Sequence, residues 1–245
     1  MQKQSLLLLS TLAAVLTGCS SFNWSTTPTV KGSGNVVTET REVSQFDQVG
    51  VSGSGHLSIV QGDRESLTIE ADDNLLPLIK SEVSGSLLNI GPENVNLSPS
   101  KTIRYQLQLK NLKGLLLAGS LEAEAPSIQT DQLRLVISGS GNIQVRKLAS
   151  GDLVAQVSGS GDIQLAGKVN HQTVQISGSG NYRAGDCESQ DSAVQVSGSG
   201  NVTVWARAKL DAHVSGSGDV HYYGSPQVNT QVSGSGGVHP LGNKP

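Results

Sequence analysis

The chain has 245 residues, a formal net charge of −3 at pH 7, 3% aromatic residues, 29 glycines and two cysteines. The slightly acidic balance excludes the basic footprint expected of a nucleic-acid-binding protein, so we expect no nucleic-acid partner. Two cysteines exclude a disulfide framework, and the few aromatic residues confine any stacking surface to one local place.

The first 18 residues are organised like an export signal. Lys3 supplies a positive start, and residues 6–16 form an apolar run. That run is about half the length that a membrane-spanning helix needs, which is roughly 20 residues. We therefore predict a signal peptide over residues 1–18 rather than a membrane-spanning anchor.

This segment ends in Leu16-Thr17-Gly18-Cys19. The sequence resembles the bacterial lipobox, in which small residues precede a cysteine that is lipidated, with palmitate as one of its acyl chains, and becomes the mature N-terminus. The resemblance implies attachment to a membrane through lipid on Cys19. Ser20 is compatible with sorting to the outer membrane, and residues 19–31 are expected to form a polar tether. The alternative is an ordinary signal peptide that happens to contain cysteine.

The second cysteine, Cys187, follows a turn signal at Gly185 and Asp186. If Cys19 carries lipid, Cys187 has no partner for a disulfide. The surrounding sequence offers no convincing base to activate the thiol, so we expect it to be inert.

Residues 32–117 predict an irregular, β-rich N-terminal part. Looser forms of a Ser-Gly phrase begin at Gly32, Ser52 and Ser84, and short runs with alternating apolar residues lie between them. Residues 72–79 differ, because Asp72 and Asp73 precede clustered leucines that include Pro77. This pattern predicts a short helix with an acidic cap, covering one end of the sheet or core.

Residues 118–245 repeat the phrase Ser-Gly-Ser-Gly at spacings of 20, 19, 20, 18 and 18 residues. A fixed period in this range indicates stacked repeats. The copies begin at Ser138, Ser158, Ser177, Ser197, Ser215 and Ser233. Residues 118–121 (Ala-Gly-Ser-Leu) lie 20 residues before Ser138 and predict a degenerate rung.

Each phrase stands between segments in which apolar residues alternate, as in Leu133, Leu135 and Ile137. Period two is the strand signal, and the glycines suit a tight corner between two strands. We therefore predict an all-β fold, a parallel β-solenoid of 18–20-residue rungs about 4.8 Å apart. The alternative, a disordered Gly/Ser linker, does not account for the apolar period.

The order of these segments carries a family resemblance. The stretch FDQVGVSGSGHLSIVQGDRESLTIEADDNLLPLIKSEVSGSLLNI, then KTIRYQLQLKNLKGLLLAG, then the rungs, resemble the family of auto-transporter adhesin head GIN domains over residues 32–245. The resemblance implies a β-helical domain of an exported bacterial protein. The family has no catalytic residues that the resemblance could assign to positions of this chain.

An Asn or Asp follows the phrase in five of six copies, for example Asn142, Asp162 and Asp219. We expect these side chains to stack into a ladder along the corner. Calcium is the alternative, but it prefers several charged oxygen ligands, and three of the five positions carry Asn.

Catalysis on polysaccharide would need paired carboxylates. Asp162 and Asp219 occupy equivalent places three rungs apart, about 14 Å, which is too far for such a pair.

The histidines show no zinc spacing; His213 and His221 flank one corner and could lie close together as surface residues. We therefore assign no catalytic, metal or cofactor residue and leave the ligand-binding residues open.

The sequence predicts a lipid-anchored, non-enzymatic protein of the bacterial cell envelope that presents a β-helical surface for adhesion or for binding an envelope polymer, with a cell-surface glycan or protein as ligand. Two alternatives remain, a carbohydrate-active β-helix enzyme and a purely structural envelope lipoprotein. The sequence leaves open the oligomeric state and whether the domain faces the periplasm or the cell surface.

Overall fold

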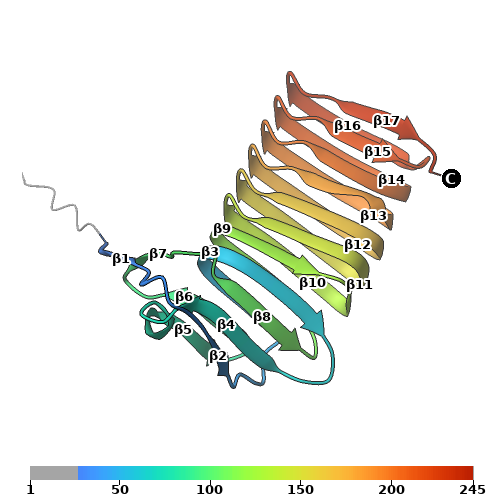
Figure 1. The fold of residues 1–245 in the computed structure, drawn as a ribbon. Coiled ribbons are helices and arrows are strands. Elements are labelled where there is room, and N and C mark those ends of the chain that lie inside the picture. The colour runs from blue at the N-terminus through green and yellow to red at the C-terminus, as the bar shows by residue number, and fades with distance from the viewer. Residues whose placement is uncertain (1–26, 245) are drawn as a thin grey trace, which may run out of the picture.

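The computed structural model describes residues 27–244. The chain forms a β-solenoid on a β-rich N-terminal part (Figure 1). Within residues 27–244 the single helical element is a 3₁₀ turn, η1 (Leu76–Leu78). The predicted all-β fold with stacked rungs and one short helix is therefore confirmed. Residues 27–244 contain no helix with the length and apolarity needed to span a bilayer.

The solenoid strands follow one another in chain order along the stack. They are β3 (Gln48–Gln61), β9 (Gly114–Ala125), β10 (Ile128–Gly139), β11 (Asn142–Gly159), β12 (Asp162–Gly178), β13 (Tyr182–Gly198), β14 (Val202–Gly216), β15 (Val220–Tyr223), β16 (Gln227–Gly234) and β17 (Val238–Gly242).

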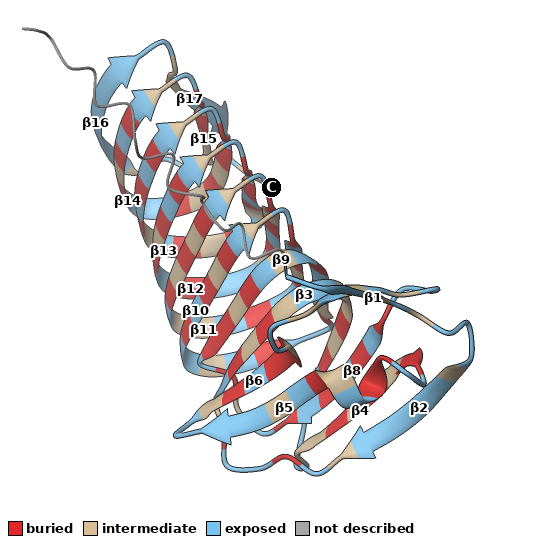
Figure 2. Ribbon diagram, turned by 90° about the vertical axis from the view of Figure 1, so that its left-hand side faces the viewer, coloured by how far each residue is buried: buried red, intermediate tan, exposed pale blue. Residues whose placement is uncertain are grey.

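Each turn of about 20 residues contributes to two faces that meet at the Ser-Gly corner. We call the face leading into the corner the entry face (residues 132–137 and their equivalents) and the face leaving it the exit face (residues 142–146 and their equivalents). Neighbouring rungs pair in parallel, so that Ser138, Ser158 and Ser177 lie in one column. Because the side chains alternate, every second residue points into the core between the two faces, and Figure 2 shows the resulting bands of buried and exposed residues.

The first rung is β3, which lies within the predicted irregular N-terminal part, residues 32–117. It pairs in parallel with β9, with Ser52 opposite Ala118 and Gly53 opposite Gly119. The rung at residues 118–121 is thus confirmed as a stacked turn. Residues 62–113 are an insertion between the first two rungs.

The insertion and the preceding segment extend both faces beyond β3. They contain β1 (Thr29–Lys31), β2 (Val36–Arg41), β4 (Ser66–Asp72), β5 (Ile79–Ser84), β6 (Leu87–Pro92), β7 (Asn96–Ser98) and β8 (Arg104–Leu109). On one face, β8 pairs with β3 in parallel, and β4 and β2 follow as antiparallel strands; on the other, β6 pairs with β3 and β5 follows. The N-terminal end of the stack is therefore finished by antiparallel strands rather than by the helical turn.

The predicted acidic cap of the short helix is wrong. The N-cap residue of η1 is Leu75, which makes no side-chain cap bond. Asp72 instead accepts hydrogen bonds from the Gly34 amide at 2.8 Å and from the Ser100 amide at 2.9 Å and hydroxyl at 2.5 Å. Asp73 accepts one from the Ser33 hydroxyl at 2.5 Å. The two carboxylates thus connect three segments that are far apart in sequence. Their oxygens accept hydrogen bonds from residues 33, 34 and 100 and do not cap the helical turn.

The last rung within residues 27–244 is exposed on its outer side. Val228 and Val232 continue core columns of the preceding rungs but are 37% and 44% exposed, because no further rung among the described residues covers them. The last turn accordingly shows almost entirely as exposed in Figure 2. Pro240 in the edge strand β17 lacks an amide hydrogen, which limits pairing of this edge with another chain.

Candidate functional site

The six complete Ser-Gly-Ser-Gly corners, from Ser138 on, stack so closely that only glycine fits at two of their four positions. Gly159 has φ = +138°, and a Cβ there would lie 2.2 Å from the carbonyl oxygen of Gly139 on the rung before. A Cβ at Gly161 would lie 2.1 Å from the carbonyl oxygen of Gly141. The two serines of each phrase point outward and are exposed in every rung from residue 138 on. The corner is therefore a scaffold that sets the spacing of the faces beside it.

The predicted ladder of Asn and Asp side chains is confirmed. The Oδ1 atom of each member accepts a hydrogen bond from the backbone N–H one rung later. The donor and acceptor pairs are Asp162 to Asn142 at 3.1 Å, Asn181 to Asp162 at 3.0 Å, Asn201 to Asn181 at 3.2 Å, Asp219 to Asn201 at 3.0 Å and Gly237 to Asp219 at 2.8 Å. These side-chain oxygens thus form hydrogen bonds that connect each rung to the next. Residues 27–244 contain no group of three or more His, Cys, Asp or Glu side chains placed to hold a metal ion.

The acidic residues that could resemble a catalytic pair gather on the exit face near His56. Nε2 of His56 lies 3.3 Å from Glu124, and its Nδ1 lies 3.8 Å from Glu122. Asp162 lines the same open depression of about 360 Å³ and is bound by Arg183 at 2.6 Å. Partial burial acts to raise the pKa of Asp162, but hydrogen bonds from Asn181 and Arg183 outweigh it and hold the pKa below its ordinary value. A general acid in glycoside hydrolysis needs the opposite shift.

The structure places His213 and His221 against the next rung rather than against each other. Nδ1 of His213 is 3.1 Å from Oε1 of Gln231. The ring centroid of His221 is 5.4 Å from that of His239, whose Nε2 lies 3.5 Å from Asp219. Both histidines therefore pair along the stack, because equivalent positions of successive rungs are the nearest outward neighbours.

An outward column of polar side chains follows the exit face through eight rungs. By register its members are Ser58, Glu124, Gln144, Gln164, Arg183, Thr203, His221 and His239. The column presents hydrogen-bonding groups at the rung spacing of about 4.8 Å.

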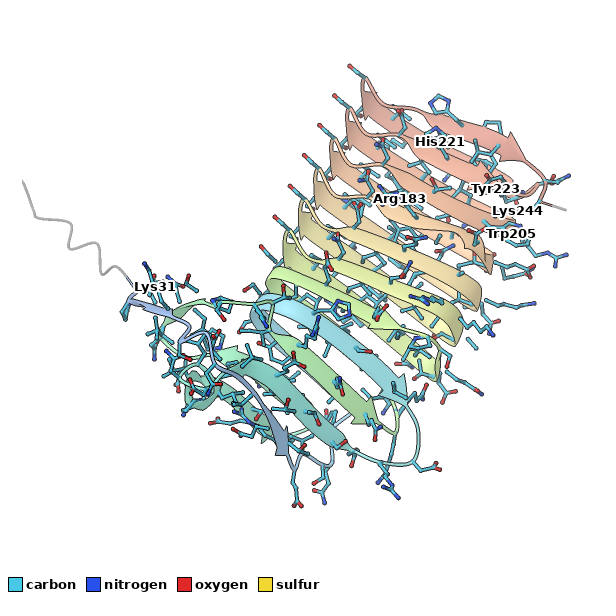
Figure 3. The ribbon with its side chains drawn as sticks, in the orientation of Figure 1. Lys31, Arg183, Trp205, His221, Tyr223 and Lys244 are labelled. Carbon is cyan, nitrogen blue, oxygen red and sulfur yellow. The ribbon has the colours of Figure 1, made fainter. Side chains whose placement is uncertain are left out.

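Beside the end of this column lies an aromatic pair. Trp205 on β14 stands directly opposite Tyr223 on β15, and both point outward. The other aromatic residues of the described chain, Phe46, Tyr105, Tyr182 and Tyr222, are buried or packed against the core. Lys244 places its ammonium 4.6 Å from the centre of the Tyr223 ring and 5.8 Å from that of Trp205. Figure 3 shows the three side chains together at one end of the last rungs.

A wider groove of about 1090 Å³ runs along the opposite corner. Four lysines line it: Lys110, Lys113, Lys147 and Lys168. Three of them form ion pairs, Lys113 with Asp47 at 2.7 Å, Lys168 with Glu188 at 3.1 Å and Lys110 with Glu65 at 3.7 Å. The acidic partners offset most of the positive charge, which weakens the groove as an anion site.

Of the two cysteines, only Cys187 lies within the described residues. Cys187 is fully buried in the core, and burial raises the pKa of its thiol to about 12, in agreement with the expected inert thiol. Cys19, the predicted lipidation site, lies outside the described residues, as do the predicted signal peptide and most of the tether.

Comparisons with known proteins agree with the repeat architecture. The family model described as "Putative auto-transporter adhesin, head GIN domain" matches residues 45–226. Among solved structures, a "putative adhesin" from Bacteroides fragilis is 24% identical with a TM-score of 0.81, covering 86% of this chain and 100% of that one. No protein of curated description matches the chain.

Two solved structures from Parabacteroides are also similar. A protein from Parabacteroides distasonis named "Putative lipid binding protein" is 26% identical with a TM-score of 0.72, covering 87% of this chain and 99% of that one. An adhesin candidate from Parabacteroides merdae is 21% identical with a TM-score of 0.69 and the same coverage. The β-solenoid with its N-terminal extension is thus shared with known structures.

Proposed function

The chain belongs to the head GIN domain family, and we propose that it is a lipid-anchored, non-enzymatic binding module of the bacterial cell envelope. The family and the fold support an adhesin-like role. The lipobox resemblance at Cys19 supports the anchor. The expected tether over residues 19–31 is shortened at its end, because Thr29–Lys31 forms β1 and pairs with β7, so residues 19–28 would connect the lipid to the domain.

The observation that carries this proposal is the polar column of the exit face. It offers hydrogen-bonding side chains in eight successive rungs at a spacing of about 4.8 Å, ending beside the Trp205 and Tyr223 pair. A flat surface with repeated polar groups and one aromatic position suits an extended polymer that makes many small contacts. We therefore propose an envelope or cell-surface glycan as the ligand, with a protein ligand as the alternative.

A lipid held inside the solenoid is a weaker candidate, although one relative is named as a lipid binding protein. Apolar side chains fill the space between the two faces. The cavity found between Ile59, Leu112 and Leu135 measures about 10 Å³, which is less than an acyl chain requires. The solenoid interior therefore serves stability, and binding is assigned to the outer faces.

The enzyme alternative requires an acid and a base at a defined separation in one cleft. The carboxylates that the exit face brings together are bound to His56, Arg146 and Arg183, and their depression is open to solvent. This arrangement favours binding over hydrolysis.

Anchoring and exposure are tested in cells that produce the full chain. Incorporation of labelled palmitate in the native protein, and its loss in Cys19→Ser, is the result expected of a lipoprotein. Protease added to intact cells should then remove the solenoid while a periplasmic control protein survives. Full protection of the solenoid would contradict adhesion and direct the search to a periplasmic partner, and palmitate incorporation in Cys19→Ser would overturn the anchor.

A further inference from the structure

Lys244 lies in a site made of two aromatic rings and a carboxylate. Its ammonium lies over Tyr223 and Trp205, at 4.6 and 5.8 Å from the ring centres, and forms an ion pair with Asp186. The Lys244 side chain is only 21% exposed, although it stands two residues after the last strand. Aromatic faces attract ammonium groups through the ring quadrupole, and a carboxylate adds charge complementarity.

The rungs are shaped to hold this site. Gly185, next to Asp186, lies beneath the tyrosine ring, where a Cβ would be 3.1 Å from Cε2 of Tyr223 and 3.2 Å from the Thr203 methyl group. The bulge in the pairing of β13 with β14 lies at this point, between Ala184 and Glu188. The bulge displaces residues 185–187 from the regular ladder and sets Asp186 beside the ring pair.

The tail that carries Lys244 is held by few contacts. The Gly224 amide donates to the Gly242 carbonyl at 3.0 Å, and the Ser225 hydroxyl donates to Oδ1 of Asn243 at 3.0 Å. Because each contact is a single hydrogen bond and neither involves a core residue, lifting the lysine out of the site requires no change in the core.

We propose that Trp205, Tyr223 and Asp186 form a binding site for an ammonium-bearing sugar, in which Lys244 is an internal occupant that the ligand displaces. This inference rests on the proposed function and names the chemical class of its ligand. A hexosamine with a free amine fits each part of the site. Its ammonium replaces that of Lys244 at Asp186, and its C–H face packs on the aromatic pair.

The side chains around the site suit an amino sugar within a polysaccharide better than an isolated amine. Thr203 and His221 stand two residues before Trp205 and Tyr223 on the same outward face, and Arg183 and His239 continue the row. Figure 3 shows Arg183 and His221 on the same face as the aromatic pair. Neighbouring sugars of a polymer would therefore meet hydrogen-bonding side chains of the polar column.

The position of the site also favours a polymer over the membrane that anchors the chain. Trp205, Tyr223 and Lys244 lie in the last rungs, at the end of the solenoid opposite to β1 (Figure 1). A lipid headgroup with an ammonium would present similar chemistry, so vesicles are included as a separate arm of the test.

Calorimetric titration of the purified full chain uses two matched probes, a glucosamine tetramer and its N-acetylated counterpart. They differ in charge at the amine, so the site predicts binding of the first and at least tenfold weaker binding of the second. Lys244→Ala should bind the glucosamine tetramer at least about threefold more tightly, because the internal competitor is gone. Trp205→Ala should abolish binding, and Asp186→Asn should remove the preference for the charged probe.

Lys209→Ala is the matched control, since Lys209 pairs with Asp211 on the entry face and should leave the affinity unchanged. Circular dichroism confirms that each variant keeps its β-structure. Equal affinity for the two probes, unchanged binding in Trp205→Ala, weaker binding in Lys244→Ala, or binding only to phosphatidylethanolamine vesicles would each overturn the assignment. None of these results alters the palmitate and protease tests, so the proposed function can stand if this ligand assignment fails.

Discussion

The hydroxyl group of Tyr182 donates a hydrogen bond to Oε1 of Gln172, 2.8 Å away, inside the solenoid core. Gln172 in turn donates to the Ser189 and Ser192 hydroxyls at 2.9 Å each. By register, Gln172 and Ser192 occupy a core column that holds Leu133, Leu153 and Leu210 in other rungs. Two central rungs thus carry a buried polar network in which every polar atom has a partner.

Tyr182→Phe should destabilise the domain by about 1–3 kcal/mol, because the Gln172 oxygen is left buried without a donor. The measurement is the midpoint of chemical denaturation. Phe is close to Tyr in shape, so packing is preserved. An unchanged midpoint would mean that the hydroxyl contributes no net stability. Tyr222→Phe, at a partly exposed position, is the control.

Asn181→Ala should cost about 1–2 kcal/mol of unfolding free energy. The change removes the acceptor of the Asn201 amide at 3.2 Å and the donor to Oδ1 of Asp162 at 2.8 Å. Gln195→Ala, on the exposed entry face, should change stability by less than about 0.5 kcal/mol. Equal effects of the two substitutions would contradict a stabilising ladder.

Gly159→Ala and Ser158→Ala should differ strongly although they are neighbours. The first places a Cβ 2.2 Å from the Gly139 carbonyl oxygen at a φ of +138°, so we expect a loss of more than about 3 kcal/mol or no folding. The second removes an exposed hydroxyl and should stay within about 0.5 kcal/mol. Soluble yield and thermal melting check both, and a well-folded Gly159→Ala would refute the stacked corner.

Stability should fall as the pH drops below about 4. The hydroxyl and amide hydrogen bonds from Ser100 are the main reason that the pKa of Asp72 lies below its ordinary value of 3.8. The Ser33 hydroxyl is the main reason for the lowered pKa of Asp73. Since the folded state prefers the ionised carboxylates, their contribution is complete above pH 3.8 and is lost as the pH falls through the folded pKa values.

Ser100→Ala should therefore lower the denaturation midpoint at pH 7, and its effect should shrink as the pH falls through the lowered folded pKa of Asp72. Midpoints measured between pH 7 and pH 2 test this. A difference between native protein and variant that stays constant over the whole range would show that Asp72 is not the group involved.

Cys187 should resist thiol reagents in the native state, because burial raises the pKa of its thiol to about 12 and hides it from solvent. In Cys19→Ser, dithionitrobenzoate should release no colour at pH 8 until denaturant is added. Rapid labelling without denaturant would show that the rungs around β13 open locally.

The repeat was predictable because stacking imposes it on the sequence. Counterparts of Gly159 and Gly161 recur in all six complete Ser-Gly-Ser-Gly phrases because a Cβ there would meet backbone, and the core alternation follows from the pleat. The start of the stack was not predictable, because Ser52 reaches Ala118 across an insertion that interrupts the period. The acidic cap failed because Asp72 finds donors at Gly34 and Ser100, which no local pattern reveals.

The candidate site was only partly predictable. Trp205 and Tyr223 are 18 residues apart, which is one repeat, and both occupy outward-facing positions of their strands. The repeat spacing was therefore enough to predict that they lie side by side on neighbouring rungs. Lys244 and Asp186 could not be added from the sequence. Lys244 follows the last strand, and Asp186 lies in a bulge that shifts the strand register. The repeat spacing therefore does not predict where either side chain lies.

The parallel register has a consequence for how such a module changes over evolutionary time. In the regular part of the stack each rung forms its backbone hydrogen bonds with the rungs about 20 residues before and after it, so a whole rung can be duplicated or lost while the remaining backbone pairing is kept. Each such event would lengthen or shorten the reach of the protein by about 4.8 Å. Because the aromatic pair belongs to the last rungs, duplication of an earlier rung would carry it farther from the N-terminal strands without changing the residues around it.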